Sequence, residues 1–289
     1  VLTEEVTGPD WTGNVVQLNQ ENPDVQDFLI DAATFWLQET DIDGLVLHAA
    51  DQSSIAFLNR LTTELKEEFP DKYLLADILD PAADIDELVA NTVFDAVDDY
   101  DLGNAISEVF SAPDQSATEI YEVYEQTADR HSLLFVDDKY SKRFTQKAAE
   151  NGRNSVTSWM LTLTYMYTTP GNPIILQGSE LSMYGETAED SQRLLPLHSG
   201  EQELKEFHTR IASLRSEFPA VRYGDFELVG SNDFLTVFKR TYEDQTIYIA
   251  INNGSESSYV DVPGIGSDKT WRGYLGANIA RENEEGTHR

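Results

Sequence analysis

Apolar residues in the first part of this chain follow two patterns that alternate along the sequence, helical spacing and short continuous runs. Asn22-Pro23 suits the start of a helix, because Asn caps the first turn and Pro fits inside it. The apolar residues behind it recur at helical spacing and predict one buried helix face, made of Val25, Phe28, Leu29, Ala32 and Trp36. The run from Gly44 to His48 is typical of a buried parallel strand.

The same two patterns predict the elements that follow. Short runs predict strands at Tyr73–Ile78, Phe94–Val97, Ser132–Val136 and Pro173–Leu176. Helical spacing predicts helices at Ile55–Phe69, Asp84–Ala90, Gly103–Phe110, Ser116–Ala128 and Asn154–Thr168. Strands that alternate with helices indicate an α/β fold with a parallel sheet.

The spacing changes from Phe226 onward. Thr236–Arg240 and Thr246–Ile251 are typical of paired strands, with residues of high β propensity. We therefore predict a domain boundary near Tyr223-Gly224. It separates a larger domain over residues 1–223 from an all-β domain over residues 224–289.

Charge and cysteine content exclude several function classes. The 289 residues include 52 acidic and 20 basic side chains, a formal net charge of -32, which disfavours nucleic acid and anionic membrane surfaces as partners. Two interpretations of the acidity stay open, a solubilising coat for a salty or extracellular setting and a surface for a cationic partner. The absence of Cys excludes disulfides, thiolate metal sites and cysteine nucleophiles. No apolar stretch is long enough to span a membrane, and the localisation, otherwise unknown, is expected to be extracellular.

In one segment the flanking residues match a known motif, but the residues between them differ from it. Residues 135–144 read F-V-D-D-K-Y-S-K-R-F and resemble the F-x-x-N-H-D-x-x-R-F segment of the α-amylase family, glycoside hydrolase family 13. Phe135, Arg143 and Phe144 match and set the register, and Arg143 is expected to keep the structural role that the family gives it. The resemblance then places Lys139 at the family's substrate-binding His and Tyr140 at its transition-state-stabilising Asp.

Two earlier segments resemble the family's other catalytic motifs with similar replacements. Residues 43–52 fill the place of G-F-R-x-D, where Gly44 matches but Val46 stands at the Arg and His48 at the nucleophile. Residues 73–80 resemble L-x-G-E-x-x-D, where Ala76 replaces Gly and Asp77 replaces the acid/base Glu.

These replacements imply a loss of hydrolysis. Retaining glycosidases need two carboxyl groups about 5–5.5 Å apart, one as nucleophile and one as acid/base. His48 cannot form the usual glycosyl ester, and Asp77 is one methylene shorter than the Glu it replaces, where acid geometry tolerates little error. Tyr140 is neutral near pH 7 and cannot offset the positive charge of the transition state. We therefore predict a catalytically inactive site, because the members of such a constellation act together.

The resemblance continues to the end of the chain. Residues 170–180 resemble the family's P-G-x-P-x-I-Y-Y-G-x-E segment at the last barrel strand, and residues 203–224 resemble the last barrel helix and its exit. Residues from Trp11 to Val25 resemble the approach to the third barrel helix. The implied fold is the second half of an α-amylase-type (β/α)8 TIM barrel, followed by a small antiparallel β-sandwich, domain C.

Nothing in the chain resembles the first three barrel strands or the early motif that holds calcium in the family, so we expect no cofactor. A closed barrel needs eight strands, and five would leave an exposed apolar edge. We therefore expect either a fragment or a partner chain that supplies a missing N-terminal half-barrel.

Ligands of such barrels gather at the carboxyl ends of the strands, and this makes His48, Asp77, Lys139 and Tyr140 candidate substrate-binding residues. Each has a plainer interpretation. His48 can result from sequence drift at a former catalytic position, and Asp77 can be a hydrogen-bonded residue at a strand end. Tyr140 can fill the emptied subsite, and Lys139 can form a local ion pair with the neighbouring aspartates.

Two further groups receive the plainer interpretation. Four aspartates could suggest calcium, but they do not follow an EF-hand spacing, and we predict a solvated acidic turn and no metal site: Asp95, Asp98, Asp99 and Asp101. Three aromatic residues at helical spacing are predicted to belong to the core rather than to a sugar platform: Trp159, Tyr165 and Tyr167.

The sequence thus predicts an inactive α-amylase homologue that binds an α-glucan or another oligosaccharide. Two alternatives stay open. One is an active α-glucan hydrolase with an unusual catalytic set, and the other is a scaffold or protein-interaction module that binds no sugar.

Overall fold

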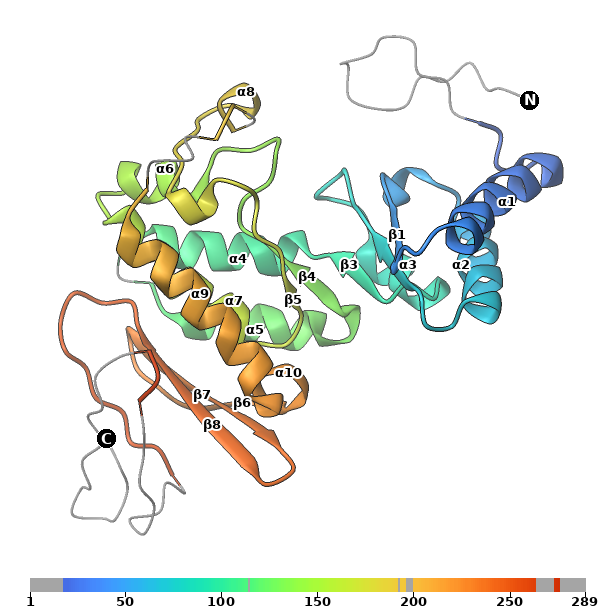
Figure 1. Ribbon diagram of the computed structural model, residues 1–289. Coiled ribbons are helices and arrows are strands. Elements are labelled where there is room, and N and C mark those ends of the chain that lie inside the picture. Colours follow the sequence, from blue (N-terminus) through green and yellow to red (C-terminus); the bar gives the residue numbers. More distant parts are fainter. Residues whose placement is uncertain (1–17, 114, 192, 196–199, 264–272, 276–289) are drawn as a thin grey trace. The chain divides into compact units, whose positions relative to one another are not determined.

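The structure, a computed structural model, describes residues 18–113, 115–191, 193–195, 200–263 and 273–275 (Figure 1). Trp11 and parts of the predicted all-β domain lie outside these ranges. The chain divides into two compact units. One comprises residues 1–99 and 129–132, and the other comprises residues 100–128 and 133–289.

The first unit holds three parallel strands and the helices between them. Its elements are α1 (Pro23–Glu39), β1 (Gly44–Leu47), η1 (Ala50–Gln52), α2 (Ile55–Glu68), β2 (Tyr73–Ala76), α3 (Ile85–Asn91) and β3 (Ala96–Asp98). Helix α1 begins as predicted, with the Asn22 side chain accepting the N–H of Asp24 at 3.0 Å. The strands pair in parallel register, with Leu47 opposite Ala76 and Ala76 opposite Val97. This register aligns the carboxyl ends of β1 and β2.

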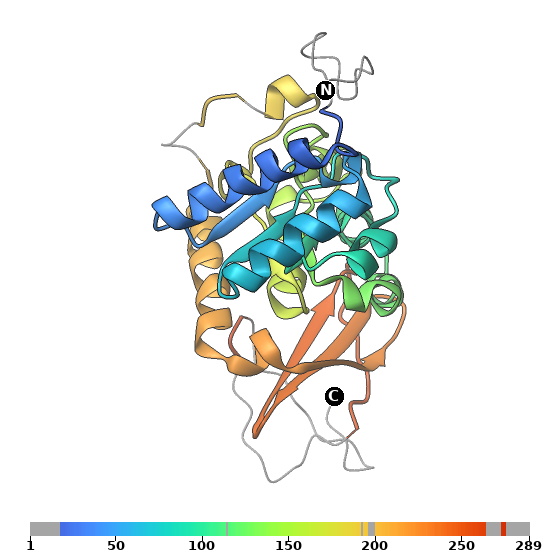
Figure 2. The same ribbon diagram turned by 90° about the vertical axis from the view of Figure 1, so that its right-hand side faces the viewer.

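Two burial predictions for this unit are wrong. Helix α1 packs against α2 (Figure 2) and buries Ile30 and Leu37, whereas Phe28 is 66% and Trp36 55% exposed. The apolar residues of α1 occupy several faces, so the neighbouring helix decides which of them is covered. Strand β1 is also less buried than predicted, with Val46 63% exposed, because β1 stands at the end of its sheet.

The second unit holds most of the remaining elements. They are α4 (Tyr100–Ser111), α5 (Ala117–Thr127), α6 (Phe144–Glu150), α7 (Ser155–Thr168), β5 (Asn172–Pro173), η3 (Ser179–Leu181), α8 (Ala188–Ser191), α9 (Gln202–Glu217), α10 (Pro219–Tyr223), β6 (Asp225–Ser231), β7 (Leu235–Tyr242) and β8 (Gln245–Asn252). Strand β4 (Ser132–Leu134) and the turn η2 (Ala128–Arg130) lie where the chain passes between the units. β4 and β5 are parallel, with Leu134 opposite Pro173. Helix α6 was not predicted.

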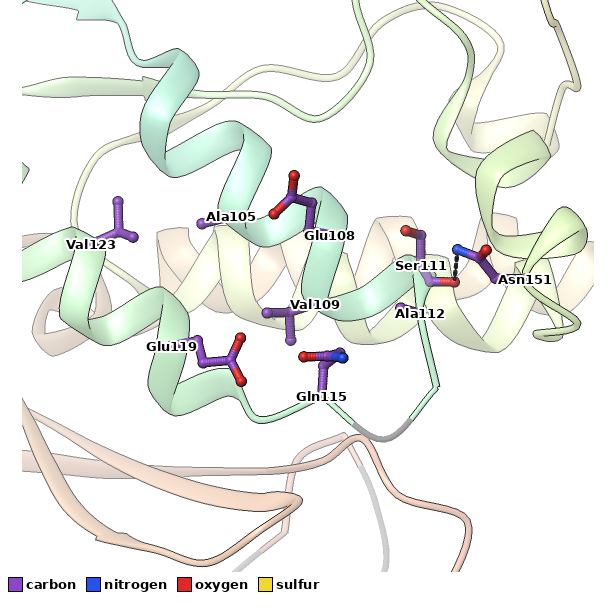
Figure 3. Close-up of a pocket in the computed structure, with 9 residues that line it drawn as sticks. All are labelled: Ala105, Glu108, Val109, Ser111, Ala112, Gln115, Glu119, Val123 and Asn151. Atoms are coloured by element: carbon purple, nitrogen blue, oxygen red, sulfur yellow. Dashed lines mark hydrogen bonds between the residues drawn. The ribbon is translucent and has the colours of Figure 1, made fainter.

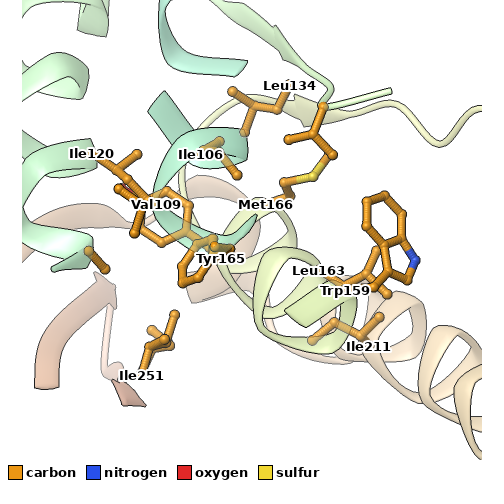
Figure 4. Close-up of a cluster of buried hydrophobic side chains, with 14 of the residues drawn as sticks. Ile106, Val109, Ile120, Leu134, Trp159, Leu163, Tyr165, Met166, Ile211 and Ile251 are labelled. Carbon is orange, nitrogen blue, oxygen red and sulfur yellow. The ribbon is translucent and has the colours of Figure 1, made fainter. Parts of the chain in front are cut away.

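One apolar core joins the helices of the second unit to its antiparallel sheet (Figure 4). Trp159 and Tyr165 of α7 are each 1% exposed, which confirms their predicted place in the core, while Tyr167 is half-buried. The sheet β6-β7-β8 contributes Phe238, Ile249 and other apolar side chains. Strands β7 and β8 are thus the predicted pair, whereas β6 was not predicted, and the sheet shares a core with the helices before it. The boundary near residue 223 stays a prediction.

Two arginines, Arg240 buried and Arg215 half-buried, hold the carbonyl end of α7 beside this sheet. Arg240 of β7 donates from Nη1 to Thr168 O at 2.7 Å and from Nη2 to Gly224 O at 2.8 Å. Arg215 of α9 donates to Gly171 O at 2.9 Å and to Tyr167 O at 3.1 Å. Cations at a helix C-terminus are stabilised by the helix dipole and satisfy carbonyls that the helix leaves open. Among the described residues, no helix is both long and apolar enough to cross a lipid bilayer.

Candidate functional site

His48 and Asp77 follow the last residues of β1 and β2. Leu47 and Ala76 are partners in the parallel ladder, so His48 and Asp77, which follow them, lie side by side at the carboxyl ends of the two strands. The structure brings them into contact, with His48 Nδ1 against Asp77 Oδ2. The His48 side chain is 50% and that of Asp77 32% exposed, so the pair faces solvent.

The turn behind this pair is fixed by backbone and side-chain hydrogen bonds. Ala50 N donates to Asp77 O at 2.9 Å, and Asp77 N donates to Leu47 O at 3.0 Å. The carboxylate of Asp51 accepts the N–H of Leu79 at 2.8 Å. These hydrogen bonds fix the backbone around His48 and Asp77.

Lys139 and Tyr140 lie in the second unit, in the loop between β4 and α6. The carboxylate of Asp138 accepts the N–H groups of Tyr140 and Ser141 at 2.7 and 2.6 Å, an arrangement that Asp commonly forms in turns. Tyr140 is 45% exposed, and Lys139 Nζ lies 4.9 Å from the centroid of its ring. The loop thus presents an aromatic ring beside a cationic group.

Buried residues hold the base of this loop. Arg143 is 1% exposed and donates to Gln177 O at 3.0 Å and to Ser191 O at 2.7 Å, which confirms its predicted structural role. Asp137 accepts from Phe144 N at 2.6 Å and from the Ser179 hydroxyl at 2.7 Å.

The Arg143 guanidinium lies 3.6 Å from the carboxylate of Asp137. Burial raises the pKa of the Asp137 carboxyl, while its hydrogen bonds and the charge of Arg143 act in the opposite direction. Ser179 and Ser191 could not be identified from the sequence, because they contact Arg143 from 36 and 48 residues away.

The prediction of a solvated acidic turn is wrong for Asp95, Asp98 and Asp99, which lie in or beside β3, whereas Asp101 is exposed on α4. Asp99 is fully buried and accepts the hydroxyl of Ser132 at 2.6 Å, and Asp98 accepts the N–H of Ile78 at 3.2 Å. Asp95 accepts the N–H of Leu74 and pairs with Lys66 at 2.6 Å. In the part of the chain that the structure describes, no three His, Cys, Asp or Glu side chains gather as a metal site requires.

The predicted site residues thus form two pairs, His48 with Asp77 and Lys139 with Tyr140, one in each unit. The first pair can exchange a proton, and the second can contact a ring and an electron-rich group. Neither pair supplies two neighbouring carboxyl groups.

The fold has parallel strands that alternate with helices, polar residues at the carboxyl ends of these strands, and an antiparallel sheet later in the chain. These features define the class as an α/β barrel-type protein with a C-terminal β domain. Comparison with known proteins specifies the family. The family model of the alpha-amylase C-terminal domain matches residues 224–289. The chain is 28% identical over 263 residues to a cyclomaltodextrinase of Geobacillus thermopakistaniensis, and 26% identical over 260 residues to a maltogenic alpha-amylase of Bacillus acidopullulyticus. Each match covers 86% of this chain and 43% of the relative.

Comparison with solved structures also finds similarity to alpha-amylases. An alpha-amylase of Anoxybacillus has a TM-score of 0.84 at 33% identity and covers 94% of this chain, which spans 61% of that protein. An alpha-amylase of Geobacillus thermoleovorans, solved with acarbose, has a TM-score of 0.85 at 34% identity, with 96% of this chain and 64% of that protein covered.

The chain is similar over most of its length to proteins of the α-amylase family, glycoside hydrolase family 13, and its last part matches the C-terminal domain of that family. Its fold is the second half of the amylase barrel followed by the C-terminal domain, of which a three-stranded antiparallel sheet is described. The chain spans less than half the length of the curated relatives named above.

Proposed function

We propose that this chain is part of an α-amylase-family protein that binds an α-glucan through the strand-end residues and does not hydrolyse it. The contact between His48 and Asp77 carries the proposal. These residues stand where the family motifs place the nucleophile and the acid/base. The names of the relatives, cyclomaltodextrinase and maltogenic alpha-amylase, support an α-glucan as the ligand.

The chemistry of the pair argues against glycoside cleavage. A retaining mechanism uses two carboxyl groups at a fixed separation, and here one of them is an imidazole in direct contact with the other. The Asp77 oxygen that faces His48 is occupied by the imidazole nitrogen, so it is not placed to protonate a glycosidic oxygen. The site therefore lacks both the carboxylate nucleophile and a carboxyl group placed as acid/base, and the retaining mechanism needs both.

The second pair supplies groups suited to sugar binding. Aromatic rings pack against the apolar faces of sugars, and the exposed ring of Tyr140 offers such a face. The Lys139 ammonium beside it can donate to sugar hydroxyls. We therefore assign stacking to Tyr140 and hydrogen bonding to Lys139.

Calorimetric titration of the full-length natural protein with maltoheptaose tests the proposal. We expect saturable binding heat without the continuing heat of hydrolysis. Tyr140→Ala should weaken binding about fivefold, since stacking of this kind contributes on the order of 1 kcal/mol. Tyr259→Ala is the matched control, because Tyr259 is 62% exposed but lies outside the 135–144 segment.

Each contrary result refutes a separate part of the proposal. Continuing hydrolysis heat, abolished by Asp77→Asn, would refute the inactive site and favour an enzyme with an unusual catalytic set. No heat with maltoheptaose would refute glucan binding and favour a scaffold. Equal weakening by Tyr140→Ala and Tyr259→Ala would refute the role of Tyr140.

A further inference from the structure

A hollow of about 400 Å³ opens in the second unit between α4, α5 and the end of α6 (Figure 3). None of the four strand-end residues discussed above lines it. Its volume lies within the range of about 300–1,000 Å³ that is typical of small-molecule sites. The hollow therefore requires an account separate from the proposed glucan site.

The spacing of residues along two helices creates this hollow. Ala105, Glu108 and Val109 stand three and four positions apart, so they share one face of α4. Glu119 and Val123 of α5 are likewise four positions apart. Figure 3 shows these two faces turned toward each other, so each contributes one carboxylate and apolar side chains to the same space.

Three polar groups of the hollow lack partners within the described parts of the chain. Neither the Glu108 nor the Glu119 side chain makes an ion pair or hydrogen bond to a described residue. Ser111 at the end of α4 is only 5% exposed and lines the hollow, and its hydroxyl has no hydrogen-bond partner among the residues that the structure describes. Its carbonyl, by contrast, accepts the side-chain amide of Asn151 at 3.1 Å. The Ser111 hydroxyl oxygen is not among the fully buried polar atoms, so it is accessible from the hollow and can hydrogen-bond to a ligand there.

We infer that this hollow binds an organic cation, an ammonium or guanidinium group carried on a short alkyl stem. The two carboxylates attract the charge and accept its N–H groups, and charge-assisted hydrogen bonds of this kind are stronger than neutral ones. The alkyl stem packs against Ala105, Val109 and Val123. The Ser111 hydroxyl supplies a further acceptor. The cation can come from a free alkylamine or from a Lys or Arg side chain of another protein.

The experiment is an NMR or calorimetric titration of the full-length natural protein with n-butylammonium, with 1-butanol as the neutral probe of equal stem. We expect n-butylammonium to bind saturably and 1-butanol to bind at least about tenfold more weakly, because loss of a charge-assisted hydrogen bond costs on the order of one power of ten in affinity. Glu108→Gln and Glu119→Gln should each weaken n-butylammonium binding about tenfold. Ser111→Ala should weaken it less.

Glu122→Gln is the matched control. Glu122 is exposed on α5, as Glu119 is, but does not line the hollow, so its variant should bind n-butylammonium within about twofold of the parent. Equal weakening by all three Glu→Gln variants would show only diffuse attraction by the net charge of -32 and would overturn the site. Equal binding of the two probes would overturn the role of the charge.

A third arm identifies the source of the cation. N-acetyl-lysine methylamide carries the same ammonium on a peptide unit. Binding at least about tenfold tighter than n-butylammonium would assign the hollow to a protein side chain, and weaker binding would assign it to a free amine. The maltoheptaose titration is independent of these results, since none of the hollow's residues belongs to the strand-end pairs.

Discussion

The hydrogen bond between Trp159 and His208 makes the stability of the second unit depend on pH. Trp159 Nε1 donates to His208 Nε2 at 2.9 Å, so that nitrogen must be unprotonated for the bond to form. Burial lowers the pKa of His208 from its ordinary value, while the charge of Glu180 acts in the opposite direction. Because the unfolded state binds the proton more readily, this contribution to stability is complete above the unfolded pKa near 6.5. It is lost as the pH falls through the lowered folded pKa.

The magnitude follows from the indole group. Trp159 is 1% exposed, so protonation of His208 leaves its N–H without an acceptor in an apolar core. Such a buried donor costs about 1–3 kcal/mol. His208→Gln keeps an acceptor that does not titrate, and His208→Leu removes the acceptor at every pH. The glutamine variant should therefore lose less stability at pH 5 than the parent, and the leucine variant should be about 1–3 kcal/mol less stable at pH 7.

Urea unfolding followed by tryptophan fluorescence, between pH 5 and 8, measures these differences. Protonation of the many carboxylates changes stability in all variants alike, so the informative quantity is the difference between a variant and the parent at each pH. His131→Asn is the control. His131 is exposed with a φ of 53°, a backbone conformation that Asn tolerates, so its variant should follow the parent. A constant difference between His208→Gln and the parent across the whole range would refute the reasoning.

Three further substitutions and one control substitution test the packing. Gly44→Ala should destabilise the first unit by more than about 2 kcal/mol, because an added Cβ would lie 2.0 Å from Tyr73 O; circular dichroism during heating measures this, and an unchanged melting temperature would show that β1 moves freely. Tyr165→Phe should stabilise the protein by about 1 kcal/mol in urea unfolding, since its buried hydroxyl has no partner among the described residues, and a loss of stability would reveal a bound water or another acceptor. Arg240→Met should cost about 2–4 kcal/mol in the same assay because it leaves two carbonyls without donors. Lys239→Met on the same strand should cost less than about 1 kcal/mol, since its ion pair with Glu227 is half-exposed, and equal losses would contradict the role given to Arg240.

Local features of the fold could be predicted from the sequence, because the groups that determine them are close in the chain. Asn22, Asp84, Ser116 and Asn154 each accept an N–H two or three residues ahead, and each begins a helix near its predicted start. Helix α6 was missed because few of its residues are apolar and it directly follows the 135–144 loop.

Features that depend on distant residues could not be predicted. The buried face of α1 depends on its packing against α2. Helical spacing alone therefore predicted burial of Phe28 and Trp36, which are exposed. Asp99 is buried where the hydroxyl of Ser132, 33 residues later, donates a hydrogen bond to its carboxylate. The contact between His48 and Asp77 likewise follows from the register of two strands, which no local pattern states.

Burial explains how a chain can keep the frame of the amylase motifs while its chemistry differs. Arg143 and Phe144 are at most 1% exposed, and Arg143 holds two backbone carbonyls, so a change at either would cost packing or buried hydrogen bonds. His48 and Tyr140 are about half exposed, and replacing such side chains costs the fold little. The fold therefore constrains the frame and leaves the strand-end positions to function. It follows that likeness to the family, which rests on the frame and the sheet, does not by itself establish hydrolysis, because hydrolysis depends on the groups at the strand ends.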